Sequence, residues 1–134
     1  MATTHFSGPI AVGGTSINAT AAEINNAADV SGRIQELTAT AAVTAGVQSL
    51  ELNHVSTVVA ATIADSSNHQ GVFIVKDTSA SGTAAHTLTL TAGTFDGTHN
   101  VATLNAPGEA LAVYFDSAGA GVILSNVGTV GLSS

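Results

Sequence analysis

The sequence contains no cysteine and no tryptophan, and it has very few charged residues. Without cysteine there can be no disulfide, no thiolate metal site and no cysteine nucleophile. Only 8% of the 134 residues are charged, whereas an average soluble domain has roughly 25%. Because contact surfaces between proteins are depleted in charge at their centres, this composition is typical of a protein that packs extensively against other subunits. We therefore expect an oligomer.

Basic residues are almost absent, since Arg33 and Lys76 are the only two against nine acids and the formal net charge is −7. Such a chain lacks the positive patch that neutralises phosphates, so nucleic acid is not an expected partner. Residues 1–8 lack the basic start and apolar core of a signal peptide. No apolar run approaches the roughly 18 residues of a membrane span. We expect a protein made in the cytoplasm, with no membrane partner.

The apolar residues are mostly small, because the hydrophobic fraction is 45% but the aromatic fraction is only 4%. Small side chains bury little area each, so stability is expected from packing and association. The length suits a single domain. Residues 1–16 carry Gly8-Pro9 and Gly13-Gly14 among scattered apolar positions, which predicts an extended N-terminal arm. Residues 17–134 are expected to form one β-rich domain.

One helix signal stands near the start of that domain. Thr20-Ala21-Ala22-Glu23 has the spacing of a capping box, in which threonine and glutamate each satisfy an N–H at the helix end. Ser31-Gly32 offers a stop. Four apolar residues at spacings of four, three and four form one stripe: Ile17, Ala21, Ile24 and Ala28. The sequence therefore predicts a short helix near residues 20–30.

After Gly32 the sequence reads as short strands separated by turns, because β-branched residues alternate between two faces. The segment 55–64 is almost wholly apolar, which is typical of a strand covered on both sides. About eight strands are expected, over 48–54, 55–64, 71–77, 84–91, 101–104, 109–115, 122–124 and 127–132. This spacing predicts a mainly β fold, a single antiparallel β-sandwich or jelly-roll-like barrel. No internal repeat is visible.

Two segments, which together cover about a third of the chain, resemble sequences found in known structural proteins. The first is Ala19-Thr20-Ala21-Ala22-Glu23-Ile24-Asn25-Asn26-Ala27-Ala28-Asp29-Val30-Ser31, within 19–33. It resembles a capped segment that recurs in bacteriophage head-decoration, head-fibre and tail-fibre proteins. The second, within 101–132, begins Ala102-Thr103-Leu104-Asn105-Ala106-Pro107-Gly108-Glu109-Ala110-Leu111 and is similar to the closing hairpin of small phage β-domains. Many of these have an aromatic residue after the hairpin loop, where this chain has Gly121-Val122.

The resemblance implies a homotrimer that sits on the outside of a phage capsid and cements neighbouring subunits of the major capsid protein. It places the protein on the capsid surface of the virion, after synthesis in the host cytoplasm. Tail fibres share these segments but are usually far longer, since they must reach a receptor, so the length favours the head. A phage tail-fibre module, or one that binds a receptor or glycan, is the alternative.

Six residues are candidates for contacts with the capsid or with sister subunits. In the arm, which would insert among capsid subunits or cross to a sister chain, Phe6 and Ile10 are apolar anchors. Arg33 is a candidate for an ion pair across a subunit boundary. His86 is expected on the apolar face of its strand with Leu88 and Leu90, as a satisfied interface histidine. The full set is Phe6, Pro9, Ile10, Val12, Arg33 and His86.

The histidines do not have the spacing of a recognised metal site. Asp96 with His99, and Asp65 with His69, would each offer two ligands in a turn, but histidines that hydrogen-bond locally are the stronger expectation. The five are His5, His54, His69, His86 and His99. No metal site is therefore predicted.

Signatures of catalysis are missing as well. The carboxylates of Glu51, Asp77, Glu109 and Asp116 are scattered without a neighbouring base. The sequence has no nucleophile elbow, phosphate-binding loop or dinucleotide fingerprint. A Thr87-x-Thr89-x-Thr91 row is typical of ice-binding surfaces, but a single such strand favours an ordinary polar face. We expect neither an enzyme nor a cofactor.

Overall fold

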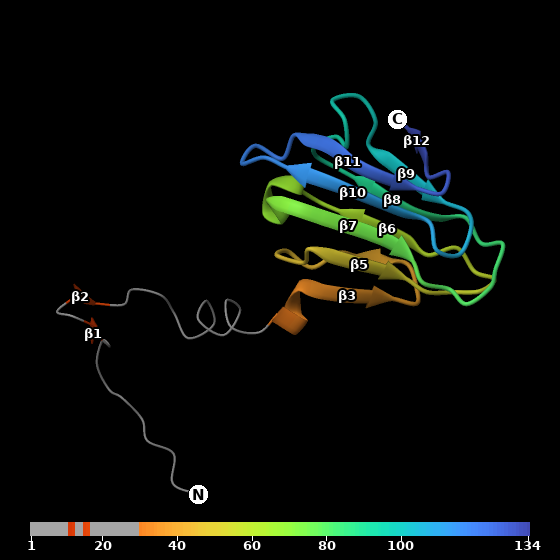
Figure 1. Cartoon of the computed structure of the whole chain (residues 1–134), viewed down its shortest axis with the longest axis horizontal. Helices are drawn as coiled ribbons and strands as arrows, with labels where there is room; N and C mark the ends of the chain where they lie inside the picture. The colour runs from red at the N-terminus through yellow and green to blue at the C-terminus, as the bar shows by residue number, and fades with distance from the viewer. Residues whose placement is uncertain (1–10, 13–14, 17–29) are drawn as a thin grey trace, which may run out of the picture. The chain divides into compact units, whose positions relative to one another are not determined.

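The computed structural model describes residues 11–12, 15–16 and 30–134 (Figure 1). The chain divides into two units, residues 1–30 and 31–134, and each is described by itself. In the first unit β1 (Ala11–Val12) and β2 (Thr15–Ser16) form an antiparallel pair. The rest of the expected arm and the expected helix near 20–30 lie outside the described residues, which resume at the 3-10 helix η1 (Val30–Arg33).

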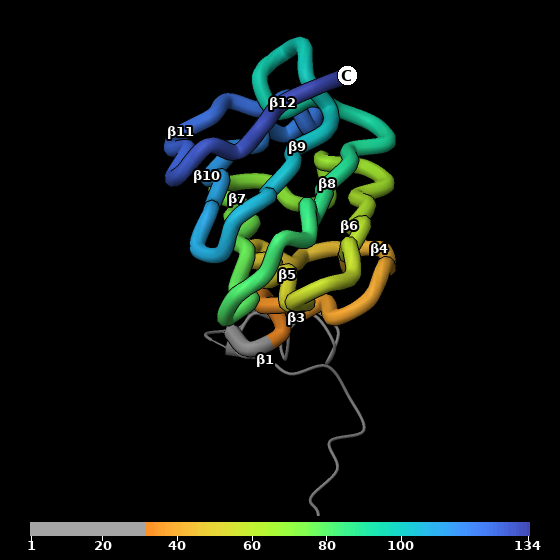
Figure 2. The backbone as a smooth tube through the Cα atoms, turned by 90° about the vertical axis from the view of Figure 1, so that its right-hand side faces the viewer, coloured from red at the N-terminus to blue at the C-terminus, as the bar shows by residue number. Residues whose placement is uncertain are grey.

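The second unit consists of two five-stranded sheets that lie face to face (Figures 1 and 2). The first sheet has the order β11-β10-β7-β5-β3. Its strands are β3 (Ile34–Leu37), β5 (Ser49–Leu52), β7 (Gly71–Asp77), β10 (Ala110–Phe115) and β11 (Gly121–Val127). The second sheet has the order β12-β9-β8-β6-β4. Its strands are β4 (Ala41–Ala42), β6 (Ala60–Ile63), β8 (His86–Leu90), β9 (Val101–Leu104) and β12 (Gly131–Ser133). A 3-10 helix, η2 (Ser66–His69), joins β6 to β7.

From β3 to β8 the chain alternates between the two sheets, so each strand of the first sheet is followed by one of the second. β3, β5 and β7 pair in parallel, and so do β4, β6 and β8. The chain therefore winds through three coils that stack along the hydrogen-bonding direction. From β9 onward the pairing is antiparallel, and it completes both sheets.

This architecture confirms a mainly β, sandwich-like fold but corrects the expectation of all-antiparallel strands or a jelly-roll-like barrel. Both sheets are mixed, and they do not close into a barrel. The coils are also an internal repetition that the sequence does not reveal. Ser49 pairs with Ile34, fifteen residues earlier, and with Ile74, twenty-five residues later. Because successive coils differ in length, no fixed sequence period marks them.

Period-two alternation placed several strands correctly. The strands expected over 71–77 and 101–104 are β7 and β9, residue for residue. The strand expected over 55–64 is wrong in its first half, because β6 begins only at Ala60. Nδ1 of His54 accepts hydrogen bonds from the N–H groups of Ser56 (3.2 Å) and Thr57 (2.9 Å), which folds this stretch into a turn. Val55 and Val58 are consequently exposed.

The last strand also differs from expectation. β11 runs on to Val127, and the chain reverses before β12 begins at Gly131. Gly128 has a φ of 84°, a left-handed conformation that glycine adopts without steric cost. The side chain of Asn126 bridges the turn, since it accepts from the N–H of Val130 and donates to its carbonyl. The alternation seen over 127–132 therefore spans two strands and a turn.

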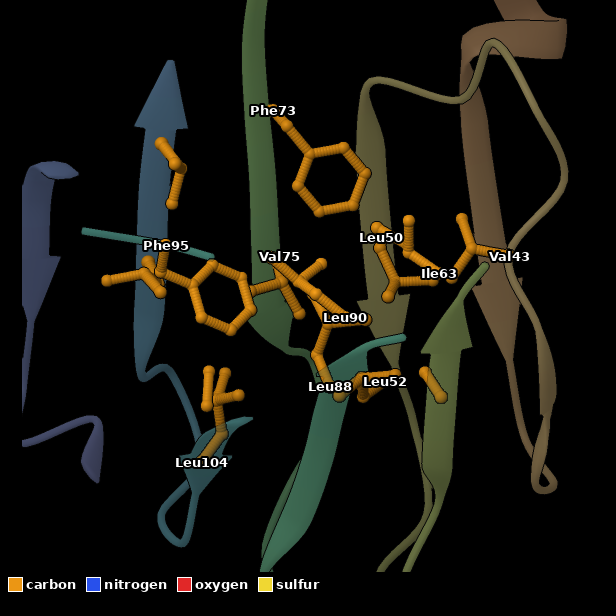
Figure 3. Close-up of a cluster of buried hydrophobic side chains, with 14 of the residues drawn as sticks. Val43, Leu50, Leu52, Ile63, Phe73, Val75, Leu88, Leu90, Phe95 and Leu104 are labelled. Atoms are coloured by element: carbon orange, nitrogen blue, oxygen red, sulfur yellow. The ribbon is translucent and has the colours of Figure 1, made fainter. Parts of the chain in front are cut away.

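The core lies between the sheets and is made of inward-pointing side chains of the strands together with loop residues such as Val43 and Phe95 (Figure 3). Phe73, Phe95 and Phe115 are fully buried, and the ring of Phe115 lies 6.0 Å from that of Phe73 and 6.4 Å from that of Phe95, centroid to centroid. Aliphatic side chains fill the rest: Leu50, Leu52, Ile63, Val75, Leu88, Leu90, Leu104, Leu111 and Val113. Nearly all the large buried side chains thus face one shared interior.

Alternation along β8 gives a test of this packing. We expect Leu88→Ala to lower the free energy of unfolding by about 2–5 kcal/mol, because it leaves a cavity between the sheets. Thr89→Ala is the matched control, since Thr89 is the next residue and points away from the core; its effect should stay within about 1 kcal/mol. Urea denaturation measures both, and equal losses would contradict the assignment of the two faces of β8.

Candidate functional site

The structure does not bring the six candidate contact residues together. Phe6, Pro9 and Ile10 lie outside the described residues, and Val12 belongs to β1. Arg33 is exposed at the end of η1, and its carbonyl accepts a hydrogen bond from the N–H of Gln48 (2.8 Å). The side chain of His86 is fully buried. His86 therefore offers no surface to a subunit or capsid, which corrects the expectation of an interface histidine.

His86 instead belongs to a polar pair between the two sheets. It points inward from β8 with Leu88 and Leu90, as the alternation predicted. Its Nδ1 accepts a hydrogen bond from the N–H of Val59 (3.0 Å). Its Nε2 lies 4.0 Å from Oδ1 of Asp77, the last residue of β7, and has no hydrogen-bond partner among the described residues.

Asp77 is held in turn by the loop that follows β7. Its Oδ1 accepts from the N–H (2.9 Å) and the hydroxyl (2.6 Å) of Ser79, and both residues are buried. The N–H and carbonyl of Asp77 bond to Glu109 and Gly108. Asp77 is therefore satisfied by Ser79 and by the backbone of Gly108 and Glu109, whereas Nε2 of His86 faces it at 4.0 Å without a hydrogen bond.

This geometry determines the protonation of the His86 ring. Because Nδ1 accepts from a backbone N–H, it carries no proton, so the ring is neutral with its proton on Nε2. His99 is a control with the opposite pattern, since its Nδ1 lies 2.7 Å from a carboxylate oxygen of Asp96, which can only accept. We expect ¹H–¹⁵N correlation spectra at neutral pH to find the proton of His86 on Nε2 and a proton of His99 on Nδ1. A proton on Nδ1 of His86 would refute this arrangement.

Glu109 forms a second buried polar site, at the turn between β9 and β10. One oxygen accepts from the N–H groups of Asn105 (2.7 Å) and Ala106 (3.2 Å), and the other from the N–H and hydroxyl of Thr129 (both 2.9 Å). Burial alone raises the pKa of Glu109, but these hydrogen bonds outweigh it and hold the pKa below its ordinary value. The carboxylate thereby ties the β9–β10 turn to the β11–β12 turn.

We expect Glu109→Gln to lower the free energy of unfolding at pH 7 by about 1–3 kcal/mol, because an amide replaces a carboxylate that accepts from four donors. A lowered pKa means that the carboxylate stabilises the fold above the pKa of unfolded glutamate, and that this stabilisation is lost as the pH falls through the folded-state pKa. The difference from wild type should therefore shrink on acidification.

Thr129→Ala is the graded control for this prediction, because it removes one hydroxyl donor and keeps the backbone N–H. Its effect should be smaller than that of Glu109→Gln. Urea denaturation between pH 3 and pH 7 measures all three proteins. A difference between wild type and Glu109→Gln that stays constant over this range would contradict the role of the ionised carboxylate.

His54 and His99 make the local hydrogen bonds that were expected, whereas His69, buried in η2, bonds to a residue far away in the sequence. Oδ1 of Asp96 accepts from the N–H groups of His99 (2.8 Å) and Thr98 (3.0 Å), and its other oxygen contacts the His99 ring. The His99 hydrogen bonds lower the pKa of Asp96 to about 2. The ring of His69 donates to the carbonyl of Val47 (2.7 Å), while Asp65 accepts from the N–H of Ser67. In residues 30–134 no three histidine or acidic side chains gather in a way that could hold a metal ion.

The outer side of the first sheet is apolar, and we call it the apolar face; it is the side turned to the viewer in Figure 1. Of the nine large hydrophobic side chains exposed in the described part of the chain, seven lie there, between 39% and 60% exposed. They are Ile34, Val72, Ile74, Tyr114, Val122, Leu124 and Val127. Ala110 and Ala112 lie among them. The polar residues on this side are Glu36, Glu51, Lys76, Ser49 and Ser125. The sheet is thus mostly apolar on its outer side as well, and the described residues cover only its inner side.

The outer side of the second sheet differs, and we call it the threonine face. Thr87 of β8 lies beside Thr103 of β9, and Thr89 lies beside Thr62 of β6. The five strands of this sheet contain no Asp, Glu, Lys or Arg. The threonine row seen in the sequence is therefore part of a wider uncharged but polar surface.

Sequence reasoning missed the apolar face, although a signal was present. In β7, Val72 and Ile74 alternate with Phe73 and Val75, so both sides of the strand are apolar. Such strands usually lie between two covering layers, and the sequence after Gly32 predicts no helix to supply the second layer.

None of the described helices has the length and apolarity needed to span a membrane. No protein-family profile, curated protein or solved structure matches the chain.

Proposed function

We propose that this chain is a structural virion protein that binds the outside of a bacteriophage capsid as a homotrimer and stabilises the shell. The observation that carries the proposal is the apolar face, which the described residues leave open to solvent. Contiguous exposed apolar surface marks sites of protein association. The low charged fraction of 8% favours the same use, since charge is depleted where subunits meet.

The two segments with phage-like sequence support a place on the capsid. The second, residues 101–132, runs from β9 into β12, and within it β10 and β11 pair as an antiparallel hairpin. The two buried acids, Asp77 and Glu109, accept hydrogen bonds from loop backbone and so stabilise the fold. This use of carboxylates favours a structural protein. Neither acid is free to act on a substrate while it holds these loops.

In the proposed function, the protein stabilises the shell by shifting its assembly equilibrium. A protein that binds only the assembled shell shifts the assembly equilibrium toward the closed particle. Three linked copies multiply weak contacts, since each further contact forms within one complex. The arm proposed over residues 1–16 would add main-chain hydrogen bonds to an exposed edge of a capsid subunit, with Phe6 and Ile10 as anchors.

This function is tested with the full chain and phage heads stripped of surface proteins. We expect the chain to co-sediment with heads and to raise the temperature and osmotic shock at which they release DNA. A variant lacking residues 2–12 should bind heads more weakly while its circular dichroism and unfolding midpoint stay unchanged. Unaltered head binding by that variant would overturn the role of the arm.

Two other outcomes would overturn the function itself. A tail-fibre or glycan-binding module would bind host cells or immobilised glycans and would leave heads unaffected. A hydrolase would release sugar from host surface polysaccharide. Light scattering on the free chain gives the number of copies, and a head-binding monomer would refute the trimer while leaving the capsid as partner.

A further inference from the structure

The chain between β5 and β6 makes a turn, residues 54–59, whose start is held by a histidine ring. Nδ1 of His54 accepts hydrogen bonds from the N–H groups of Ser56 (3.2 Å) and Thr57 (2.9 Å). Asparagine and aspartate side chains hold turns in the same way, by accepting from backbone N–H groups that follow them. The ring of His54 therefore takes the place of a side chain that does not titrate near neutral pH.

The far end of the turn is held by a second histidine, which comes from another strand. Nδ1 of His86, on β8, accepts from the N–H of Val59 (3.0 Å), and both side chains are fully buried. In the described part of the chain, no further N–H group of residues 54–59 donates a hydrogen bond. Histidine nitrogens therefore accept every hydrogen bond that the N–H groups of this turn donate there.

Only neutral rings can hold the turn in this way. A neutral imidazole has one nitrogen that donates and one that accepts, whereas both nitrogens donate in the protonated ring. Because Nδ1 is the acceptor in His54 and in His86, an added proton would point at a backbone N–H. The closed turn therefore binds fewer protons than an open turn, and its stability falls as the pH falls.

Asp77 gives a protonated His86 another partner. Its Oδ1 faces Nε2 of His86 from the other sheet at 4.0 Å, which is beyond hydrogen-bond distance, and Nε2 has no other partner among the described residues. A protonated ring is attracted to a carboxylate, and the charge strengthens the hydrogen bond between them. The neutral ring is thus best satisfied by Val59 and the charged ring by Asp77.

The other segments packed around the two rings bring no further charge within 4.0 Å of them. In the second sheet Leu104 of β9 is the register neighbour of His86. The 78–85 loop packs on the turn, since a Cβ at Gly82 would overlap the carbonyl oxygen of Val55, and this loop contains no charged residue. Glu36 of β3 accepts from the side chain of Asn53 (2.6 Å). No ion pair within 4.0 Å in residues 30–134 involves the ring of His54.

The other two histidines among the described residues have the opposite role. Nδ1 of His99 lies 2.7 Å from a carboxylate oxygen of Asp96, and Nδ1 of His69 lies 2.7 Å from the carbonyl oxygen of Val47. Both partners can only accept, so a protonated ring keeps these hydrogen bonds. Acid should therefore act on the 54–59 turn and leave these two loops in place.

We propose that residues 54–59 form a pH-sensitive turn, which is closed while His54 and His86 are neutral and opens when they take up protons. An ordinary histidine takes up its proton at about pH 6.5, so the turn begins to open below that value. Opening exposes Val59 and frees the 78–85 loop that packs on the turn. The proposal concerns the chain by itself and does not rest on the proposed function.

Amide hydrogen exchange of the ¹⁵N-labelled full chain between pH 7.5 and pH 5 tests this proposal. Exchange is expressed as protection factors, which remove the intrinsic effect of pH. We expect the protection factor of the Val59 N–H to fall about tenfold for each pH unit below about 6.5, because the open turn holds one more proton on His86. Those of Ser56 and Thr57 should fall in the same way through His54.

The same spectra contain the controls. The N–H groups of Thr98 and His99 bond to Asp96, which stays ionised over this range because its pKa is about 2, so they should keep their protection. Amides of β7 and β10 should also keep theirs. Equal losses in these strands and in the turn would indicate general unfolding and would overturn the proposal.

His54→Asn is the matched variant, because the asparagine oxygen can accept from the same two N–H groups but does not titrate. Ser56 and Thr57 should then stay protected down to pH 5, while Val59 still responds through His86. His86→Asn should do the converse, and circular dichroism at pH 7.5 checks that it folds. His54→Asn, whose ring is only half-buried, decides the test if the His86 variant does not fold.

Asp77→Asn tests the alternative partner of His86. It keeps an oxygen that can accept from Ser79 but removes the negative charge, so the loss of protection at Val59 should move to lower pH. Protection at Ser56, Thr57 and Val59 that stays constant between pH 7.5 and pH 5 in the wild type would overturn the pH-sensitive turn. An unchanged response of Val59 in Asp77→Asn would remove Asp77 from it.

Discussion

Burial of apolar side chains between two sheets is the interaction on which the rest of the structure depends. The chain alternates between the sheets from β3 to β8, so each coil adds one strand to each side of the same core. Three phenylalanine rings and a set of leucines supply most of the buried volume. With little aromatic area available, the sheets must match closely, because small side chains gain little burial each.

The few acids of the chain are used mainly to hold those loops. Seven acids lie in residues 30–134, and five of them accept hydrogen bonds from backbone N–H groups. These five are Asp65, Asp77, Asp96, Glu109 and Asp116. Side-chain acceptors of this kind satisfy loop N–H groups that no strand pairs. The remaining two, Glu36 and Glu51, lie together on the first sheet beside Lys76. Most of the acidic side chains in residues 30–134 therefore serve as hydrogen-bond acceptors for loops, and few are left as ordinary surface charges.

Period-two patterning predicted the local structure well because side-chain alternation is a property of one strand. It placed β7 and β9, and it placed His86, Leu88 and Leu90 on one side of β8. It failed over 55–64, where the His54 ring folds apolar residues into a turn. It also could not predict parallel pairing, because pairing joins residues such as Ile34, Ser49 and Ile74 at unequal separations.

The candidate sites were harder to predict, because burial depends on both sheets. An inward His86 was expected, but its position between two sheets required the partner strand that carries Asp77. The Glu109 site joins Asn105 to Thr129, whose N–H groups come from two different turns. The apolar face was missed for a related reason: alternation identifies the two sides of a strand but not which side another layer covers.

The outer sides of the two sheets differ in polarity. The outer side of the first sheet is mostly apolar, whereas the second sheet has a core side and a threonine side. The strands of the second sheet contain no Asp, Glu, Lys or Arg, so a strongly charged partner would not select the threonine face. Recognition through the threonine face would therefore depend on hydrogen bonds and shape, whereas the outer side of the first sheet offers apolar contact.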